Sequence, residues 1–196
     1  MKRILLFTLL FSCRLAMAQH IPDYGINRVR LNEEDRMLLF ETIPKGNLPD
    51  AVPGKTYFWY SSGRIQHTQG GYSGKLLNGV YKSYYLNKNL MEEGFFHKGL
   101  RHGNWKKWDA SGILTETSTW ENGLQNGPFQ NFDSTGRVLT SGRYRKGQIN
   151  GTLIRFITQD STVSTYYKNG VITQPVPVWK KINPFRRKKI ADAKTP

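Results

Sequence analysis

Hydrophobic and polar residues alternate along most of the chain, in short segments that end at glycine. In one such segment, positions 114, 116, 118 and 120 are Leu, Glu, Ser and Trp, whereas 115, 117 and 119 are all Thr. Successive side chains of a β-strand point to opposite faces of the sheet. Segments of about six to ten residues are short for helices and typical of strands. The pattern therefore predicts β-strands through the centre of the chain.

The same residue types recur every 24 residues. Two of the recurring positions are glycine, namely Gly79, Gly103, Gly127 and Gly151, and Gly99, Gly123 and Gly147. Two positions are mostly aromatic, namely Tyr57, Tyr81, Trp105, Phe129 and Leu153, and Tyr60, Tyr84, Trp108, Phe132 and Phe156. A further position is aliphatic, with Leu90, Leu114 and Val138. Repetition at one fixed period predicts an array of equivalent structural units.

Turn residues divide each unit into two strands. The segments 109–112 and 133–136 begin with Asp and end with Gly, as four-residue type I turns do. Asn-Gly pairs at 78–79, 122–123, 126–127, 150–151 and 169–170 are expected to provide the positive φ of tight turns. Trp105 and Trp108 are three residues apart, which requires either a bulge or aromatic residues on both faces. The predicted fold is all-β, an elongated antiparallel sheet of stacked β-hairpins.

An aromatic residue followed by two spaced glycines recurs at the junction between units. The pattern aromatic-x-x-Gly-x-x-x-Gly occurs at 96–103, 120–127 and 144–151. It resembles the MORN repeat and, more narrowly, the bacterial variant found in the antitoxin component YwqK family. The resemblance covers residues 55–171, with departures at Lys75, Lys88 and Thr152-Leu153. It implies a sheet of hairpins with a binding or scaffolding role and brings no catalytic residues.

The first 18 residues have the pattern of a secretory signal peptide. Lys2 and Arg3 precede an apolar run, and Ala16-Met17-Ala18 forms a small-x-small cleavage site before Gln19. The run is too short to cross a bilayer. A lipoprotein with Cys13 as the lipidated residue is the alternative. We therefore expect export to the periplasm, the outer membrane or the extracellular space.

The flanks of the array differ in charge. Residues 19–54 are expected to form a capping segment, a short hairpin with an acidic turn that covers the first edge of the sheet; a one-turn helix at 32–38 is the alternative. The array spans 55–174 with about five hairpins, and residues 175–196 form a basic, disordered tail. The whole chain carries +15, the mature chain +12, and residues 179–196 alone +6.

No set of residues points to catalysis. The sequence has no recognisable nucleophile, base and acid set, so we expect neither an enzyme nor a cofactor. His67, His97 and His102 lack an accompanying column of carboxylates, and a metal site is not expected. Asp109 and Asp133 are explained as backbone acceptors in turns.

Two groups of residues are candidates for binding. Tyr60, Tyr84, Trp108 and Phe132 form either a core between sheet faces or an exposed strip for glycan, peptide or lipid. In the tail, Lys180, Lys181, Arg186, Arg187, Lys188 and Lys189 are candidates for contact with anionic lipid or lipopolysaccharide. Nucleic acid is not an expected partner of an exported protein.

These observations predict an exported, non-enzymatic binding or scaffold protein that engages a protein or an envelope component. A peripheral membrane protein anchored by its tail is one alternative. An antitoxin-like partner is another, but export excludes neutralisation of a toxin in the cell's own cytoplasm.

Export is directly testable. A fusion of residues 1–25 to a reporter that is active only outside the cytoplasm should give signal, with the mature N-terminus at Gln19. N-terminal sequencing of the exported product checks the cleavage position. Labelling by a lipid precursor that depends on Cys13 would instead establish the lipoprotein.

Overall fold

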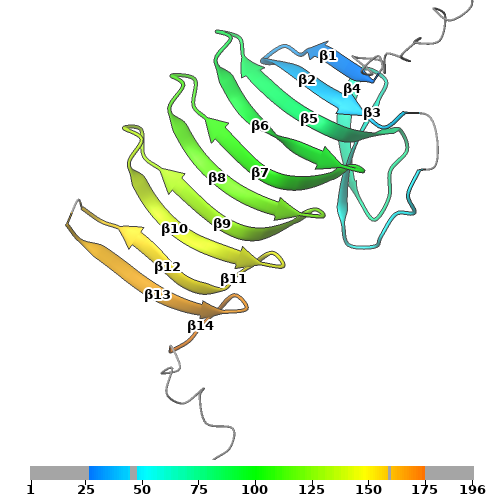
Figure 1. Ribbon diagram of the computed structural model, residues 1–196. Helices are drawn as coiled ribbons and strands as arrows, with labels where there is room; N and C mark the ends of the chain where they lie inside the picture. Colours follow the sequence, from blue (N-terminus) through cyan, green and yellow to red (C-terminus); the bar gives the residue numbers. More distant parts are fainter. Residues whose placement is uncertain (1–26, 45–47, 159, 175–196) are drawn as a thin grey trace, which may run out of the picture.

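The computed structural model describes residues 27–44, 48–158 and 160–174. All regular structure in these ranges is β-strand (Figure 1). The strands are β1 (Arg28–Asn32), β2 (Arg36–Thr42), β3 (Thr56–Ser61), β4 (Arg64–Gln69), β5 (Lys75–Tyr85), β6 (Leu90–His97), β7 (Leu100–Trp108), β8 (Leu114–Glu121), β9 (Leu124–Phe132), β10 (Val138–Arg145), β11 (Gln148–Ile149), β12 (Gly151–Phe156), β13 (Thr162–Lys168) and β14 (Val171–Ile172).

Eleven strands form one long, curved ladder in the order β1-β2-β5-β6-β7-β8-β9-β10-β12-β13-β14 (Figure 1). Neighbouring strands are antiparallel, and β11 pairs with the end of β10 just before β12. From β5 onward the ladder follows the order of the chain, as expected for hairpins joined by short turns. The predicted all-β, elongated antiparallel sheet of stacked hairpins is confirmed.

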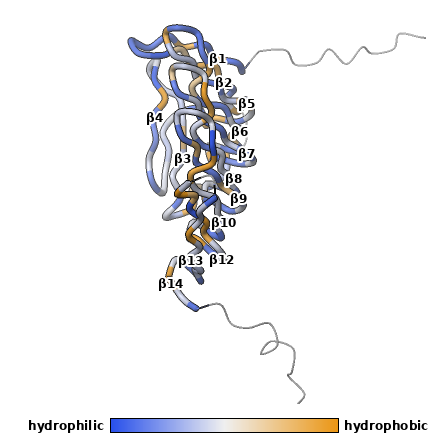
Figure 2. The backbone as a smooth tube through the Cα atoms, turned by 90° about the vertical axis from the view of Figure 1, so that its left-hand side faces the viewer, coloured by the Kyte–Doolittle hydropathy of each residue, from blue (hydrophilic) through white to orange (hydrophobic). Residues whose placement is uncertain are grey.

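The β3–β4 hairpin leaves this ladder. β3 pairs with β5 only through Trp59 and Tyr60. Figure 2 shows the hairpin beside one face of the ladder, at its N-terminal end. We call this face of the ladder the covered face and the opposite one the open face. The segment that the repeat predicts as the first hairpin of the ladder therefore lies across the sheet instead.

The β1–β2 hairpin takes the place beside β5. Its turn holds Glu33, Glu34 and Asp35, and β2 pairs with β5 from Arg36 onward. The expected hairpin with an acidic turn at the first edge is thus confirmed, and the alternative helix at 32–38 is wrong. Alternation along β2 explains the choice, because every second residue of this strand is buried on the covered face.

A hydrophobic core fills the space between the two layers. Leu38, Phe40, Leu77, Phe96 and Trp105 are its buried members. Phe58 and Tyr60 of β3 pack against it from the hairpin. A second cluster, formed by Tyr57, Trp59, Leu76 and Leu100, holds β3 against β5 and β7. Both clusters lie at the N-terminal end of the ladder.

Aromatic side chains of the ladder also lie sideways on the neighbouring strand, both in the first core cluster and further along, where Figure 2 shows a single layer. A Cβ atom on Gly94 would lie 2.2 Å from the Trp105 ring, so the indole rests on the bare backbone there. A Cβ atom on Gly142 would likewise lie 2.8 Å from the Phe129 ring. Trp105 is 1% exposed and Phe129 only 7%. Together with buried Ser118, the two glycines form a small-residue column at the repeat period, which the sequence analysis missed.

The repeat glycines serve two different purposes. Gly99, Gly123 and Gly147 lie in two-residue turns with positive φ at both turn residues, as in type I′ turns. Gly79, Gly103 and Gly127 lie inside strands, and Gly151 begins β12. Gly127 has a φ of +139° where the pairing of β8 with β9 shifts register. The positive φ expected after Asn126 is confirmed, but its placement in a turn is wrong, because the irregularity bends a continuous strand.

Trp105 and Trp108 point to opposite faces. Trp105 pairs with Ser118 on the covered face, and Lys107, two residues on, binds Glu116 on that face at 2.9 Å. The register then shifts in β8, which skips Thr115, so Trp108 follows on the open face. The same shift skips Met91 and Leu139, 24 residues before and after. Of the two explanations left open by the sequence, aromatic residues on both faces is the correct one, and the bulge lies in the partner strand β8 instead of between the two tryptophans.

Because the rings lie directly on glycine, the addition of one methyl group at such a glycine should lower the stability of the protein. Gly94→Ala should lower the free energy of unfolding by about 2 kcal/mol, because the new Cβ displaces the Trp105 indole. Urea denaturation checks this value. Gly71→Ala is the matched control, since a Cβ at Gly71 meets nothing within 4 Å, and should change stability by less than about 0.5 kcal/mol. Equal losses in the two variants would contradict the proposed packing.

Candidate binding surface

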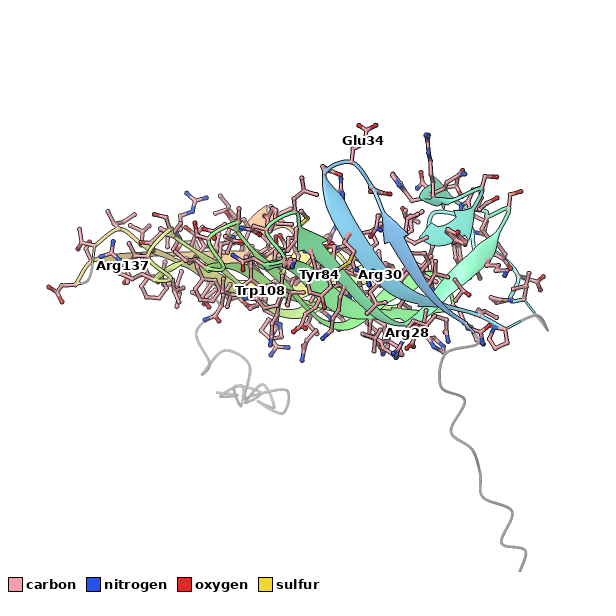
Figure 3. All side chains as sticks on the ribbon, turned by 90° about the horizontal axis from the view of Figure 1, so that it is seen from above. Arg28, Arg30, Glu34, Tyr84, Trp108 and Arg137 are labelled. Carbon is pink, nitrogen blue, oxygen red and sulfur yellow. The ribbon has the colours of Figure 1, made fainter. Side chains whose placement is uncertain are left out.

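Three of the four aromatic residues expected to form a strip lie together on the open face. Each of the three comes directly after a residue of the covered face and therefore points to the opposite, open face. They are Tyr84 on β5, Trp108 on β7 and Phe132 on β9. We call these three residues the aromatic row. In Figure 3, Tyr84 and Trp108 follow one another along the ladder. No other strand of the described part of the chain covers this face.

Aliphatic residues complete the aromatic row. Tyr84 pairs with Leu90, Trp108 with Leu114 and Phe132 with Val138 across the strands, so aromatic and aliphatic side chains alternate from β5 to β10. All of them are half-buried. Because successive rings stand two strands apart, the row repeats roughly every 10 Å. The result is a regular apolar stripe on the open face, which also carries the exposed pair Val80 and Phe95.

Two lysines beside the row share one glutamate. Glu93 lies 3.8 Å from Lys82 and 3.8 Å from Lys106, and all three are on the open face. Exposed pairs of this kind contribute little to stability. The three residues together leave a net charge of +1 beside the stripe.

Tyr60 does not join the row. It lies on β3, where its ring contacts Phe40 at 5.4 Å between centroids, on the covered face. The cause is the departure of the β3–β4 hairpin from the ladder, which the 24-residue period cannot reveal.

The covered face holds a charged cluster that the sequence analysis missed. The Arg101 guanidinium lies 4.1 Å from the Trp105 ring centroid and 5.2 Å from that of Trp120. Its Nη2 is 3.1 Å from Glu92 Oε1. Burial, and then the negative charge of Glu92, raises the pKa of Tyr81 to about 12. The repeat gives no signal for this cluster, because the positions equivalent to Arg101 are Leu77 and Gln125.

This cluster borders a cavity of about 290 Å³ between the layers. Its lining includes Phe58, His67 and Arg101. A second, largely apolar cavity of about 520 Å³ lies at the end of β3, with Ile43, Leu48 and Tyr60 in its wall.

The two repeated aspartates act in turns, as predicted. Asp109 Oδ1 accepts the backbone N–H groups of Ser111 at 2.9 Å and Ile113 at 3.0 Å. Asp133 does the same for Thr135 and Arg137. The Thr135 hydroxyl, followed by the Arg137 backbone N–H, holds the pKa of Asp133 well below its usual range.

Side-chain amides connect successive turns at the other end of the strands. Asn78 Oδ1 accepts the N–H of Lys98 at 3.0 Å, Asn126 that of Lys146 at 3.2 Å, and Asn150 that of Asn169 at 3.1 Å. The equivalent residue in the remaining unit is His102. Its Nδ1 is buried and has no hydrogen-bond partner among the described residues.

The other predicted site residues lie outside the described ranges. These are the basic residues Lys180, Lys181, Arg186, Arg187, Lys188 and Lys189, and the predicted signal peptide 1–18. Among the described residues, no group of three His, Cys, Asp or Glu is placed to hold a metal ion. Over the same ranges, there is no helix with the length and apolar character needed to span a membrane.

Comparison with known families identifies the repeats. Residues 77–98 and 101–122 match the family described as MORN repeat variant. The chain thus contains MORN-type repeats, and the matched segments are the β5–β6 and β7–β8 hairpins with their turns. Searches of curated proteins and of solved structures give no match. The narrower resemblance to antitoxin component YwqK stays a prediction.

The unpaired nitrogen of His102 predicts a stabilising substitution. His102→Asn should raise the free energy of unfolding by about 1 kcal/mol, because the amide can accept the N–H of the next turn as Asn126 does. Thermal and urea denaturation check the gain. The reciprocal change, Asn150→His, should cost a similar amount, and a loss of stability in His102→Asn would contradict the assignment.

Proposed function

We propose that this protein is an exported, non-enzymatic scaffold that binds a protein or a cell-envelope component through the aromatic row. The single observation that carries the proposal is the row itself, Tyr84, Trp108 and Phe132 at regular spacing on a face that no other described strand covers. Half-buried rings in a fixed frame offer large apolar contact area at low cost in conformational entropy.

The repeat family supports a binding role. MORN repeats generally act as binding repeats for proteins or membranes, and the row lies within and beside the matched segments. The rigid ladder fixes the distance between rings before a partner arrives, so little ordering is needed on binding.

Two alternatives rest on other parts of the chain. Residues 179–196 carry +6, which favours contact with anionic lipid or lipopolysaccharide by a peripheral membrane protein. An antitoxin-like role outside the cytoplasm rests on the YwqK resemblance alone. The aromatic row favours the scaffold over both.

Co-sedimentation of the mature protein with an isolated envelope fraction tests the proposal. Trp108→Ala removes the central ring and should weaken binding about tenfold while the protein stays folded by circular dichroism. Tyr144→Ala is the matched control, because Tyr144 packs on Phe129 on the covered face, and should bind as the parent does.

Deletion of residues 179–196 separates the scaffold from the membrane anchor. The scaffold predicts that the truncated protein keeps its binding, at low and at high salt. Loss of binding on truncation, with a steep decrease as salt rises, would establish the tail as the anchor. Equal binding by Trp108→Ala and the parent would exclude the aromatic row as the contact.

A further inference from the structure

The last hairpin of the ladder leaves backbone groups open. β13 pairs with β12 from Thr162 to Tyr167, but with β14 only at Tyr167 and Lys168. The N–H of Ile157 donates to Ser161 at 2.9 Å, so odd-numbered residues of β13 form the hydrogen bonds with β12. The N–H and C=O groups of Thr162 and Ser164 therefore point to the free side of the strand. They have no partner within the described ranges.

The chain's own sequence is unsuited to fill this edge. The N–H of Thr173 donates to Tyr166 at 2.9 Å, which fixes the register between β13 and the segment that follows. If the chain continued beside β13 in this register, position 175 would fall opposite Ser164 and position 177 opposite Thr162. Both positions are proline, which has no N–H to donate.

The two edges of the sheet differ in protection. At the first edge, Arg28 and Arg30 project from β1, and charged side chains of this kind discourage the addition of a strand. β13 has a single charge, Lys168, and is otherwise rich in Thr, Val and Tyr. Val163 on this strand is 51% exposed, and Ile157 in the adjoining turn is 63% exposed. Among the described residues, the last edge is thus uncovered and has two exposed aliphatic side chains beside it.

Positive charge is concentrated at the same end. Residues 19–137 have 14 basic and 12 acidic residues, a net +2, whereas residues 138–174 have 5 basic and 1 acidic, a net +4. The sequence after residue 174 adds a further +6. Every ion pair of the described ranges lies before residue 138. Arg155 lies directly opposite Val163 and shares its face, next to the open backbone groups.

We propose that the free edge of β13 accepts an extended, acidic segment of another protein as an additional strand. The backbone of this segment would bond to Thr162 and Ser164, its apolar side chains would cover Val163, and its carboxylates would meet Arg155. A second copy of this chain is a poor candidate, because two β13 edges carry the same positive charge, and Arg28 and Arg30 discourage pairing with the β1 edge. The site is separate from the aromatic row and does not depend on it.

Fluorescence anisotropy with a defined peptide tests the proposal. The probe is a labelled eight-residue peptide, Val-Thr-Glu-Thr-Val-Thr-Glu-Thr, added to the mature protein. Its valines and glutamates share one face of the strand, as Val163 and Arg155 share one face of the sheet. It should bind saturably, and the same peptide with lysine for glutamate should bind at least about tenfold more weakly. A third peptide, with alternate backbone amides N-methylated, keeps every charge but cannot pair, and should also bind at least about tenfold more weakly.

Two substitutions at one residue isolate the backbone contact. Ser164→Pro removes only an outward N–H and should reduce peptide binding about tenfold, whereas Ser164→Ala keeps that N–H and should bind as the parent does. Arg155→Glu should weaken binding, and Trp108→Ala should leave it unchanged.

Several outcomes would overturn the proposal. Equal binding of the N-methylated peptide would show that charge alone attracts the acidic probe, and this comparison holds even if Ser164→Pro does not fold. Equal binding of the lysine peptide would exclude an acidic partner. Dimerisation of the protein that excludes the peptide would show that a second copy occupies the edge.

Discussion

The structure depends on the direct contact between aromatic rings and bare backbone. A sheet with one layer has no second layer under which to bury large side chains, and exposed rings would make it prone to aggregate. Here the Phe129 ring, outside both core clusters, lies sideways on Gly142 of the adjacent strand, and the Trp105 ring lies on Gly94 in the same way inside the first core cluster. Each unit therefore provides both a ring and the place on which a neighbouring ring rests. Each ring must lie opposite its glycine on the adjacent strand, so the spacing between rings and glycines is fixed. The constant 24-residue period follows from this constraint.

The β3–β4 hairpin changes this arrangement at one end only. It supplies a conventional two-layer core over the first units, with Phe58 and Tyr60 packed on Phe40 and Phe96. Beyond it, the ladder relies on rings over small residues and on hydrogen bonds between successive turns. Stability in such arrays is the sum of unit and nearest-neighbour terms, so the covered end has more interactions than the last hairpins. On the open face, the aromatic row extends from the two-layer end of the ladder into its single-layer part.

Much of this fold could be predicted from the sequence, because the repeat acts through local rules. The type I turns at Asp109 and Asp133 and the strands between them follow from residue types at fixed spacing. The face of Trp108 could not be predicted, because the three-residue spacing from Trp105 left a bulge in this strand possible, and the irregularity lies at Thr115 of β8 instead. The position of Tyr60 could not be predicted from the repeat. The β3–β4 hairpin has the repeat pattern in its sequence but does not take the equivalent place in the ladder. Arg101 and Glu92 meet only in the folded sheet, and their columns hold unrelated residues in other units.

The regular stacking of the turns also fixes the distance between the two ends of the sheet. Each turn binds the one before it through the same bonds, such as Gly123 N–H to Arg101 O at 2.9 Å and Gly147 N–H to Gln125 O at 2.8 Å. Gain or loss of one 24-residue unit would therefore move the two ends of the sheet apart or together by two strand spacings, roughly 10 Å, without altering either end. Evolution can thus adjust the separation between the acidic turn of β1–β2 and the open edge of β13 in fixed increments, while the chemistry at each end stays the same.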